Sequence, residues 1–120
     1  MIDLDFELIG RDREVLLVRT PRELTHEVAD ALRECVVRHL PPRDDAGAIL
    51  DMAAVTIISS IGIAALLQIA EACKDRAAPL YLAALPDRQL KFLQMLKLDR
   101  KFPMVPTIDD ALHGIAQRHP

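Results

Sequence analysis

The spacing of apolar residues predicts that short strands and amphipathic helices alternate along the chain. Short runs rich in valine, isoleucine and leucine are typical of strands, whereas apolar residues that recur every three or four positions indicate helices. The predicted strands are residues 6–11, 14–20, 48–52 with a continuation at 55–58, 80–85 and 102–105. The predicted helices begin at residue 21 or 26, at 60, at 86 and at 110, and they reach residues 40, 76, 98 and 117.

The order of these elements, β-β-α-β-α-β-α-β-α, indicates an α/β fold. Strands that alternate with helices form crossovers in a mostly parallel sheet flanked by helices. The first two strands are joined by a turn around Gly10 and predict a hairpin, which makes the sheet mixed. Pro103 and Pro106 interrupt the last strand, so we expect it at a sheet edge. The length of 120 residues fits a single domain, which we place at 1–120.

Two starts are open for the first helix. Thr20, Pro21 and Glu23 have the form of a capping box with proline at the first helical position. Alternatively, Thr25 caps a later start, and residues 21–24 form a loop. The local pattern favours the earlier start.

The uncharged stretch 52–70 contains two serines where its composition changes. Its length would admit a membrane span, but its polar side chains, its many alanines and the lack of a flanking basic cluster argue against one. The β-branched residues 55–58 predict a buried strand, and the Ala/Leu-rich residues after Gly62 predict a buried helix. Ser59 and Ser60 lie at the changeover and can cap this helix. Because the amides and the dipole at a helix N-terminus stabilise a phosphate, an exposed hydroxyl there would be a good switch.

Composition and charge narrow the classes of function. The chain is 51% hydrophobic and 28% charged, an ordinary globular balance. A net charge of −3 and 3% aromatic residues offer neither a basic stripe nor stacking platforms for nucleic acid. Cys35 and Cys73 have no further ligand at metal-site spacing, which predicts free thiols in a reducing cytosol. Acidic residues near the N-terminus do not fit an export signal, so we expect a cytoplasmic protein.

The sequence lacks the motifs of common enzymes. Ser60 lacks the upstream glycine of a Gly-x-Ser-x-Gly elbow, because Ile58 occupies that position. There is no glycine-rich phosphate loop. The histidines are scattered, at His26, His39, His113 and His119. We therefore expect no enzyme activity, no metal and no cofactor, with a serine-dependent hydrolase as an alternative.

Three blocks of residues occur in an order typical of one known family. They are residues 23–25 with Ala29 and Leu32, residues 49–52 with 55–63, and residues 96–98 with 102–104 and 108–112. Together they resemble STAS domains, and within them the small bacterial anti-sigma factor antagonists. The first block is similar to the family's Gly-x-Leu-Asp, the second to its Asp-Ser-Ser/Thr-Gly-Leu signature, and the third to its closing helix, edge strand and helix.

The resemblance assigns roles to the residues of the second block. Ser60 aligns with the serine that a partner kinase phosphorylates, and Ser59 aligns with the preceding aspartate. Ile61 takes the place of the second Ser or Thr, and Gly62 matches the glycine. Serine can replace aspartate as a helix cap, but losing the carboxylate changes the electrostatics that a kinase meets. Ser59 is a second candidate for phosphorylation.

The resemblance implies a binding switch without catalytic machinery of its own. The surface around Ser60 and residues 22–27 would dock on an ATP-dependent serine kinase that acts as an anti-sigma factor, freeing a sigma factor. Phosphorylation of Ser60 would cause release by repulsion and desolvation, and a phosphatase is a further implied partner. The resemblance also makes Thr25 the helix cap and residues 21–24 a loop near the serines. The expected partner-binding residues are Arg22, Glu23, Thr25, His26, Ser59, Ser60, Ile61, Gly62 and Ile63.

Each of these residues also has a structural explanation. The serines can serve only as helix caps, and Gly62 can serve only close packing of helix and strand. Arg22, Glu23, His26 and Glu27 can be an ordinary solvated face. In that case the domain would be a scaffold subunit of a signalling or lipid-transport complex, a role that STAS-like domains also have.

Overall fold

The computed structural model describes residues 2–118, in which five strands form one sheet and two short strands form a second. The strands of the larger sheet are β1 (Asp5–Ile9), β2 (Val15–Arg19), β4 (Gly47–Asp51), β6 (Leu80–Ala83) and β7 (Met104–Val105). The smaller sheet consists of β3 (Glu23–Leu24) and β5 (Ile57–Ile58). The helices are α1 (His26–His39), α2 (Ser60–Asp75), α3 (Asp87–Met95), the 3-10 helix η1 (Leu98–Arg100) and α4 (Ile108–Arg118).

The larger sheet confirms the mixed, mostly parallel α/β architecture. Its strand order is β1-β2-β4-β6-β7, and every neighbouring pair except β1 and β2 is parallel. The antiparallel pair is the predicted hairpin, and its turn places Gly10 and Arg13 in the left-handed region, with φ of 96° and 58°. β7 lies at one edge of the sheet, as the two flanking prolines predicted.

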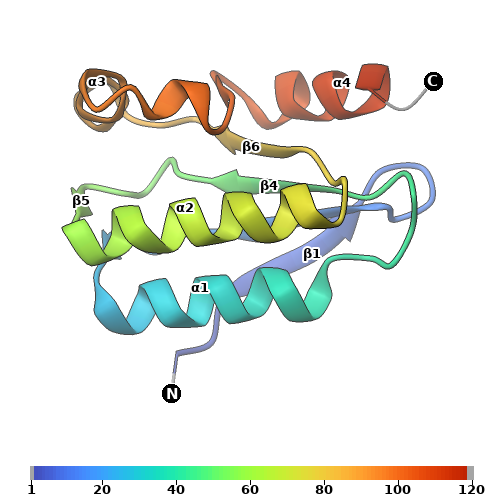
Figure 1. The fold of residues 1–120 in the computed structure, drawn as a ribbon, viewed down its shortest axis with the longest axis horizontal. Helices are drawn as coiled ribbons and strands as arrows, with labels where there is room; N and C mark the ends of the chain where they lie inside the picture. Colours follow the sequence, from blue (N-terminus) through green and yellow to red (C-terminus); the bar gives the residue numbers. More distant parts are fainter. Residues whose placement is uncertain (1, 119–120) are drawn as a thin grey trace.

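Successive residues of the central strands face different helices. Leu16 and Val18 of β2 belong to the larger core, which also contains the buried residues of α1 and α2. Val15 and Leu17 instead pack in a smaller core with Ile115 of α4. Figure 1 shows α1 and α2 on one side of the sheet and α4 on the other, and the buried Leu93 of α3 belongs to the larger core together with the residues of α1 and α2. The period of two along each strand therefore divides the aliphatic interior into two layers.

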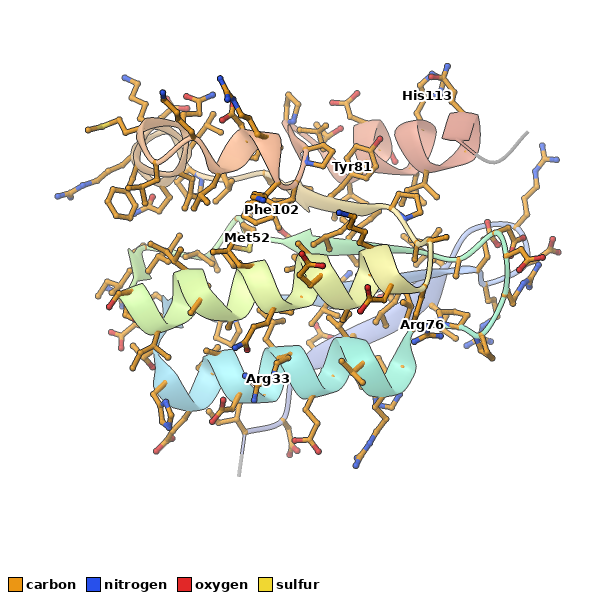
Figure 2. All side chains as sticks on the ribbon, in the orientation of Figure 1. Arg33, Met52, Arg76, Tyr81, Phe102 and His113 are labelled. Carbon is orange, nitrogen blue, oxygen red and sulfur yellow. The ribbon has the colours of Figure 1, made fainter. Side chains whose placement is uncertain are left out.

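Two arginines connect α1 to α2, and both are labelled in Figure 2. Arg33 donates from Nη1 to Oε1 of Gln68 at 2.7 Å. At the other end of the helix pair, Arg76 donates to the carbonyl oxygens of Leu40 and Pro41, at 2.9 and 3.2 Å. These bonds satisfy carbonyls just past the end of α1 and fix the position of α2, at whose N-terminus the serine pair lies.

The first helix begins at His26, so the early start at Pro21 is wrong. Thr25 is the N-cap residue, although its side chain makes no capping hydrogen bond. The Thr20 amide instead donates to the carbonyl oxygen of Asp51 at 2.9 Å and keeps the chain alongside β4. Pairing between distant segments therefore outweighs the local preference of the capping-box pattern.

Two neighbouring expectations also need correction. Residues 21–24 do not form only a loop, because their second half is β3. Residues 55–58 do not form a buried strand, because only their last two residues are β5 and Ile57 is 48% exposed. The chain leaves the larger sheet after Asp51, and Ile57 and Ile58 pair with β3 in the small sheet at the surface.

The third helix is shorter than its apolar pattern predicted. α3 ends at Met95, because Lys97 adopts a left-handed conformation with φ of 59°. Leu98 is buried, but it belongs to the separate helix η1. The apolar pattern that predicted one helix therefore spans both α3 and η1, which the left-handed Lys97 separates.

Ala77 ends α2 in a conformation that suits glycine. Its φ is 54°, and the amides of Ala77 and Ala78 donate to the carbonyls of Lys74 and Cys73 at 2.9 and 2.8 Å, which is a Schellman motif. Because a Cβ is unfavourable in this region, we expect Ala77→Gly to raise the free energy of unfolding by about 1 kcal/mol. Urea denaturation measures the change. The control Ala72→Gly, inside α2, should lower that free energy by about 0.5–1 kcal/mol, and a destabilised Ala77→Gly variant would contradict this account.

Candidate functional site

Ser59 joins β5 to α2, and its hydroxyl is fully engaged. As the N-cap residue it accepts a hydrogen bond from the Gly62 amide at 3.0 Å. The same hydroxyl donates to the carbonyl oxygen of Leu24 at 3.1 Å. The side chain is only partly exposed. Ser59 therefore caps α2 and at the same time ties it to β3.

Ser60 is the first residue of α2, and it is exposed. Of the two serine hydroxyls, only that of Ser59 is hydrogen-bonded within residues 2–118. The first turn of α2 contains no acidic residue, so no carboxylate of that turn offsets the positive end of the helix dipole. Ser60 therefore presents an uncommitted hydroxyl at a helix end that favours a phosphate.

Substitutions by alanine should separate the two serines. We expect Ser59→Ala to lower the free energy of unfolding by about 1–2 kcal/mol, because it removes the cap and the bond to Leu24. We expect Ser60→Ala to change it by less than about 0.5 kcal/mol, as for most exposed positions. Thermal unfolding of both variants side by side is the measurement. Equal losses of stability in the two variants would show that both hydroxyls contribute equally to the fold, which would contradict this assignment.

The small sheet brings the predicted loop residues to the serines. The carbonyl oxygen of Arg22 accepts the amides of Thr56 and Ile57 at 2.8 and 3.3 Å, and the Ser59 amide donates to Leu24 at 3.2 Å. Arg22 and Glu23 are both exposed on this segment. A ladder of two residue pairs thus joins parts of the chain that lie more than thirty positions apart in the sequence.

The first turn of α1 follows directly after this ladder. Thr25 is partly exposed at the N-cap position, and His26 and Glu27 are exposed. His26 lies with Nε2 3.7 Å from Oδ2 of Asp30, a contact that is an ion pair only when the imidazole is protonated. These side chains extend the exposed polar surface from β3 onto α1.

The three residues after Ser60 differ in their environment. Ile61 is 50% exposed, whereas Ile63 is partly buried and packs against the larger core. Gly62 is buried, and a Cβ there would lie 2.5 Å from the carbonyl oxygen of Leu24. Gly62 therefore permits close packing of α2 on β3, and neither Gly62 nor Ile63 is exposed to a partner as predicted.

Sequence reasoning missed the contribution of α3. Gln89 donates from Nε2 to the carbonyl oxygen of Thr56 at 2.7 Å, and α3 lies at the same end of the molecule as β5 in Figure 1. Positions 89, 92 and 96 share one face of a helix. The exposed large apolar residues of this region are Ile57, Ile61, Phe92, Met95 and Leu96. The available signal was that this short helix carries more apolar residues than one face can bury.

The described residues contain neither a formed metal site nor an activated serine. Within residues 2–118, no three His, Cys, Asp or Glu side chains lie close enough together to hold a metal ion. No base is hydrogen-bonded to the Ser60 hydroxyl in that range, as nucleophilic catalysis would require. His119 lies outside the described residues. None of the helices described is long and apolar enough to cross a membrane.

Several solved structures share this fold. An anti-sigma factor antagonist (STAS) domain protein from Planctomyces limnophilus matches with a TM-score of 0.80 at 16% identity, over 96% of this chain and 98% of that chain. An anti-sigma factor antagonist from Mycobacterium paratuberculosis matches with 0.73 at 25% identity, over 95% of each chain. The antagonist SpoIIAA in its unphosphorylated form matches with 0.74 at 17% identity, over 96% of this chain and 97% of that chain.

Two further solved structures share the fold. SpoIIAA from Bacillus is also solved in its phosphorylated form, which matches with a TM-score of 0.67 at 17% identity, over 94% of this chain and 99% of that chain. The murine anion transporter Slc26a9 matches with 0.73 at 17% identity over 87% of this chain, which covers 18% of the transporter. No curated protein sequence matches this chain.

The family model of the STAS domain matches residues 7–111. This range contains the whole larger sheet except the start of β1, and it contains the serine pair at the N-terminus of α2. The fold and the family model agree, and the chain belongs to the STAS domain family.

Proposed function

We propose that this protein is a bacterial, cytoplasmic anti-sigma factor antagonist whose binding to a serine-kinase anti-sigma factor is switched off by phosphorylation of Ser60. The similarity to anti-sigma factor antagonists supports the general role. The observation that carries the choice of residue is the difference between the serines: Ser60 is exposed and uncommitted, whereas Ser59 is occupied as a cap and a tether. The kinase would supply nucleotide, magnesium and base, so this chain needs no catalytic group of its own.

The proposed docking surface combines polar and apolar parts. The polar part consists of Arg22, Glu23 and His26 beside Ser60, all of which are exposed. The apolar part consists of the exposed residues named above, Ile57 and Ile61 with Phe92, Met95 and Leu96. Apolar anchors next to a charged rim are typical of protein interfaces. The hydrogen bond from Gln89 to Thr56 keeps the α3 part of this surface next to the serine part.

Phosphorylation would act by charge at the centre of this surface. A phosphoserine carries about −1.5 to −2 charges at neutral pH, which the N-terminus of α2 tolerates. Buried against a partner that already holds the phosphates of a nucleotide, the same charge would be repelled and poorly solvated. A coupling of about 1–3 kcal/mol, equivalent to roughly 5–150-fold in affinity, is typical of such switches.

Intact-mass measurement tests the proposed acceptor. The protein is incubated with ATP and each serine-kinase anti-sigma factor of the source bacterium. We expect one kinase to add a single phosphate to the native chain and to Ser59→Ala, but none to Ser60→Ala. Addition that persists in Ser60→Ala and disappears in Ser59→Ala would move the acceptor to Ser59. No addition by any kinase would exclude the switch.

A scaffold role is the second candidate, because the Slc26a9 match has this fold as a small part of a larger anion transporter. In that role Ser60 would be only the first residue of a helix, and the apolar face of α3 would be a permanent interface. Complete absence of phosphorylation together with stable co-purification of a partner, lost in Phe92→Glu, would favour the scaffold.

A further inference from the structure

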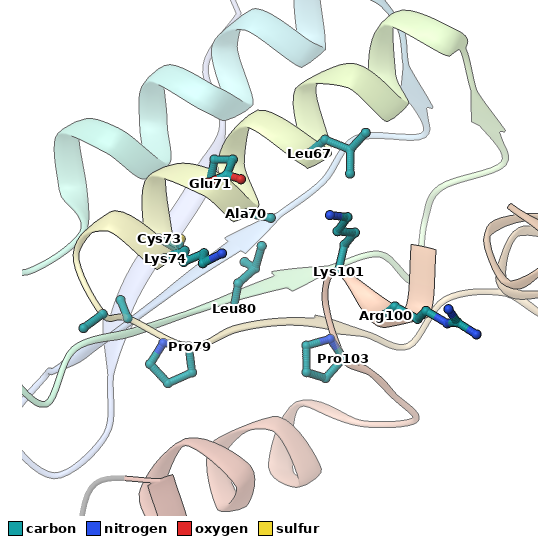
Figure 3. Close-up of a pocket in the computed structure, with 12 residues that line it drawn as sticks. Leu67, Ala70, Glu71, Cys73, Lys74, Pro79, Leu80, Arg100, Lys101 and Pro103 are labelled. Atoms are coloured by element: carbon teal, nitrogen blue, oxygen red, sulfur yellow. The ribbon is translucent and has the colours of Figure 1, made fainter. Parts of the chain in front are cut away.

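A pocket of about 580 Å³ lies between the C-terminal half of α2 and the segment that joins η1 to β7 (Figure 3). Small-molecule sites typically measure about 300–1,000 Å³. Its apolar lining consists mainly of Leu67, Ala70, Cys73, Leu80 and Pro103. The volume and the lining are therefore compatible with a small ligand rather than with water alone.

The pocket is separate from the serine site. An α-helix rises about 1.5 Å per residue, so Lys74 on the pocket wall lies about 20 Å along α2 from Ser60. A ligand in the pocket would therefore touch neither serine. Binding there can be measured without any partner of the switch.

Positive charge surrounds the apolar lining. Lys74, Arg100 and Lys101 line the pocket against a single carboxylate, that of Glu71, on a chain whose net charge is −3. In Figure 3 the side chains of Lys74 and Lys101 extend from opposite walls into the space between them, whereas Arg100 extends away from α2. Among the described residues, none of the three cations forms a salt bridge.

Cys73 lies in the wall of the pocket and adds no charge to it. It is 1% exposed, and burial raises the pKa of its thiol to about 11, with the Arg76 charge acting in the opposite direction. The thiol is therefore neutral at pH 7. The local excess of positive charge remains available to a ligand.

We propose that this pocket binds a small anion that carries an apolar chain, such as a medium-chain carboxylate or phosphate ester. The anionic head would lie between Lys74 and Lys101, and the chain would lie on Leu67, Ala70 and Leu80. An inorganic anion would leave the apolar lining in water, and a neutral hydrophobic molecule would leave the two ammonium groups without a counter-charge. Only a ligand with both parts satisfies both features.

The test uses octanoate below its micellar concentration, titrated into isotopically labelled protein and followed by amide chemical shifts. We expect saturable shifts in residues 67–80 and 98–103. Octyltrimethylammonium has the same chain with the opposite charge, and acetate has the same head without the chain. We expect both to bind at least about tenfold more weakly than octanoate, because each lacks one of the two interactions.

Charge reversal identifies the residues that hold the head. We expect Lys74→Glu and Lys101→Glu each to weaken octanoate binding by about tenfold or more. The matched control is Lys91→Glu, an exposed lysine of α3 outside the pocket, which should leave the affinity unchanged. Thermal unfolding verifies that the variants remain folded. The proposal is overturned by unsaturable octanoate shifts, by equal binding of the cationic amphiphile, or by unchanged affinity in both pocket variants.

Discussion

Gly62→Ala is expected to lower the free energy of unfolding by about 1–3 kcal/mol, although alanine favours a helix over glycine by about 1 kcal/mol. A Cβ at this position would lie 2.5 Å from the Leu24 carbonyl oxygen and 2.9 Å from Leu24 Cγ. The oxygen belongs to the backbone of β3, so no side-chain rotation removes the clash. α2 would have to move away from β3, which would strain the Ser59 bonds. Urea unfolding followed by circular dichroism measures the loss.

The control is the opposite substitution on the same helix. Ala64 is exposed two positions further along α2, and Ala64→Gly should lower the free energy of unfolding by about 1 kcal/mol through helix propensity alone. Position 62 should thus prefer glycine while position 64 prefers alanine. A Gly62→Ala variant as stable as the native chain would mean that the two segments are less tightly packed than described.

Ser60→Asp is expected to weaken binding of the kinase partner by roughly 10–100-fold while leaving thermal stability nearly unchanged. A carboxylate suits the first turn of a helix, so the isolated domain should tolerate it. In the complex the same charge would be buried near the nucleotide that the partner holds. Isothermal titration with the partner and a non-hydrolysable ATP analogue measures the affinity, and the loss should be smaller in high salt because ions screen the repulsion.

Ser60→Asn distinguishes charge from size. Asparagine nearly matches aspartate in shape but is neutral, so we expect this variant to bind within a few-fold of the native chain. Binding that survives Ser60→Asp intact would remove the main support for the switch. Equal weakening by both substitutions would indicate that steric contact, rather than charge, controls the complex.

The parts of the fold that could be predicted are the elements with a local pattern of apolar and polar residues. The hairpin, the helix from residue 60 and the edge strand before Pro106 each have a pattern of their own, and all three were confirmed. The β3–β5 ladder has no such pattern, because a strand of two residues is specified by its partner across the fold. The buried side chain of Leu24 anchors it, and local sequence does not reveal which leucine will be buried from both sides.

The site shows the same division. That a serine lies at the start of α2 follows from the change of composition around residue 59. Which hydroxyl is free does not follow, because Ser59 and Ser60 have equal capping chemistry and differ only in their neighbours. The two serines differ because only the Ser59 hydroxyl donates to the carbonyl oxygen of Leu24. Leu24 lies in β3, which was expected to be a loop. The hydrogen bond from Gln89 to Thr56 depends on where α3 lies in the fold, and the spacing of apolar residues does not predict that position.

The bond from Ser59 to Leu24 has a mechanical consequence. An ionised aspartate in this position could accept the Gly62 amide, but it could not donate to a carbonyl oxygen. The serine in this chain makes both bonds and links the two segments without a negative charge. Because Leu24 belongs to β3, a displacement of β3 would break this bond and remove a restraint on the first turn of α2.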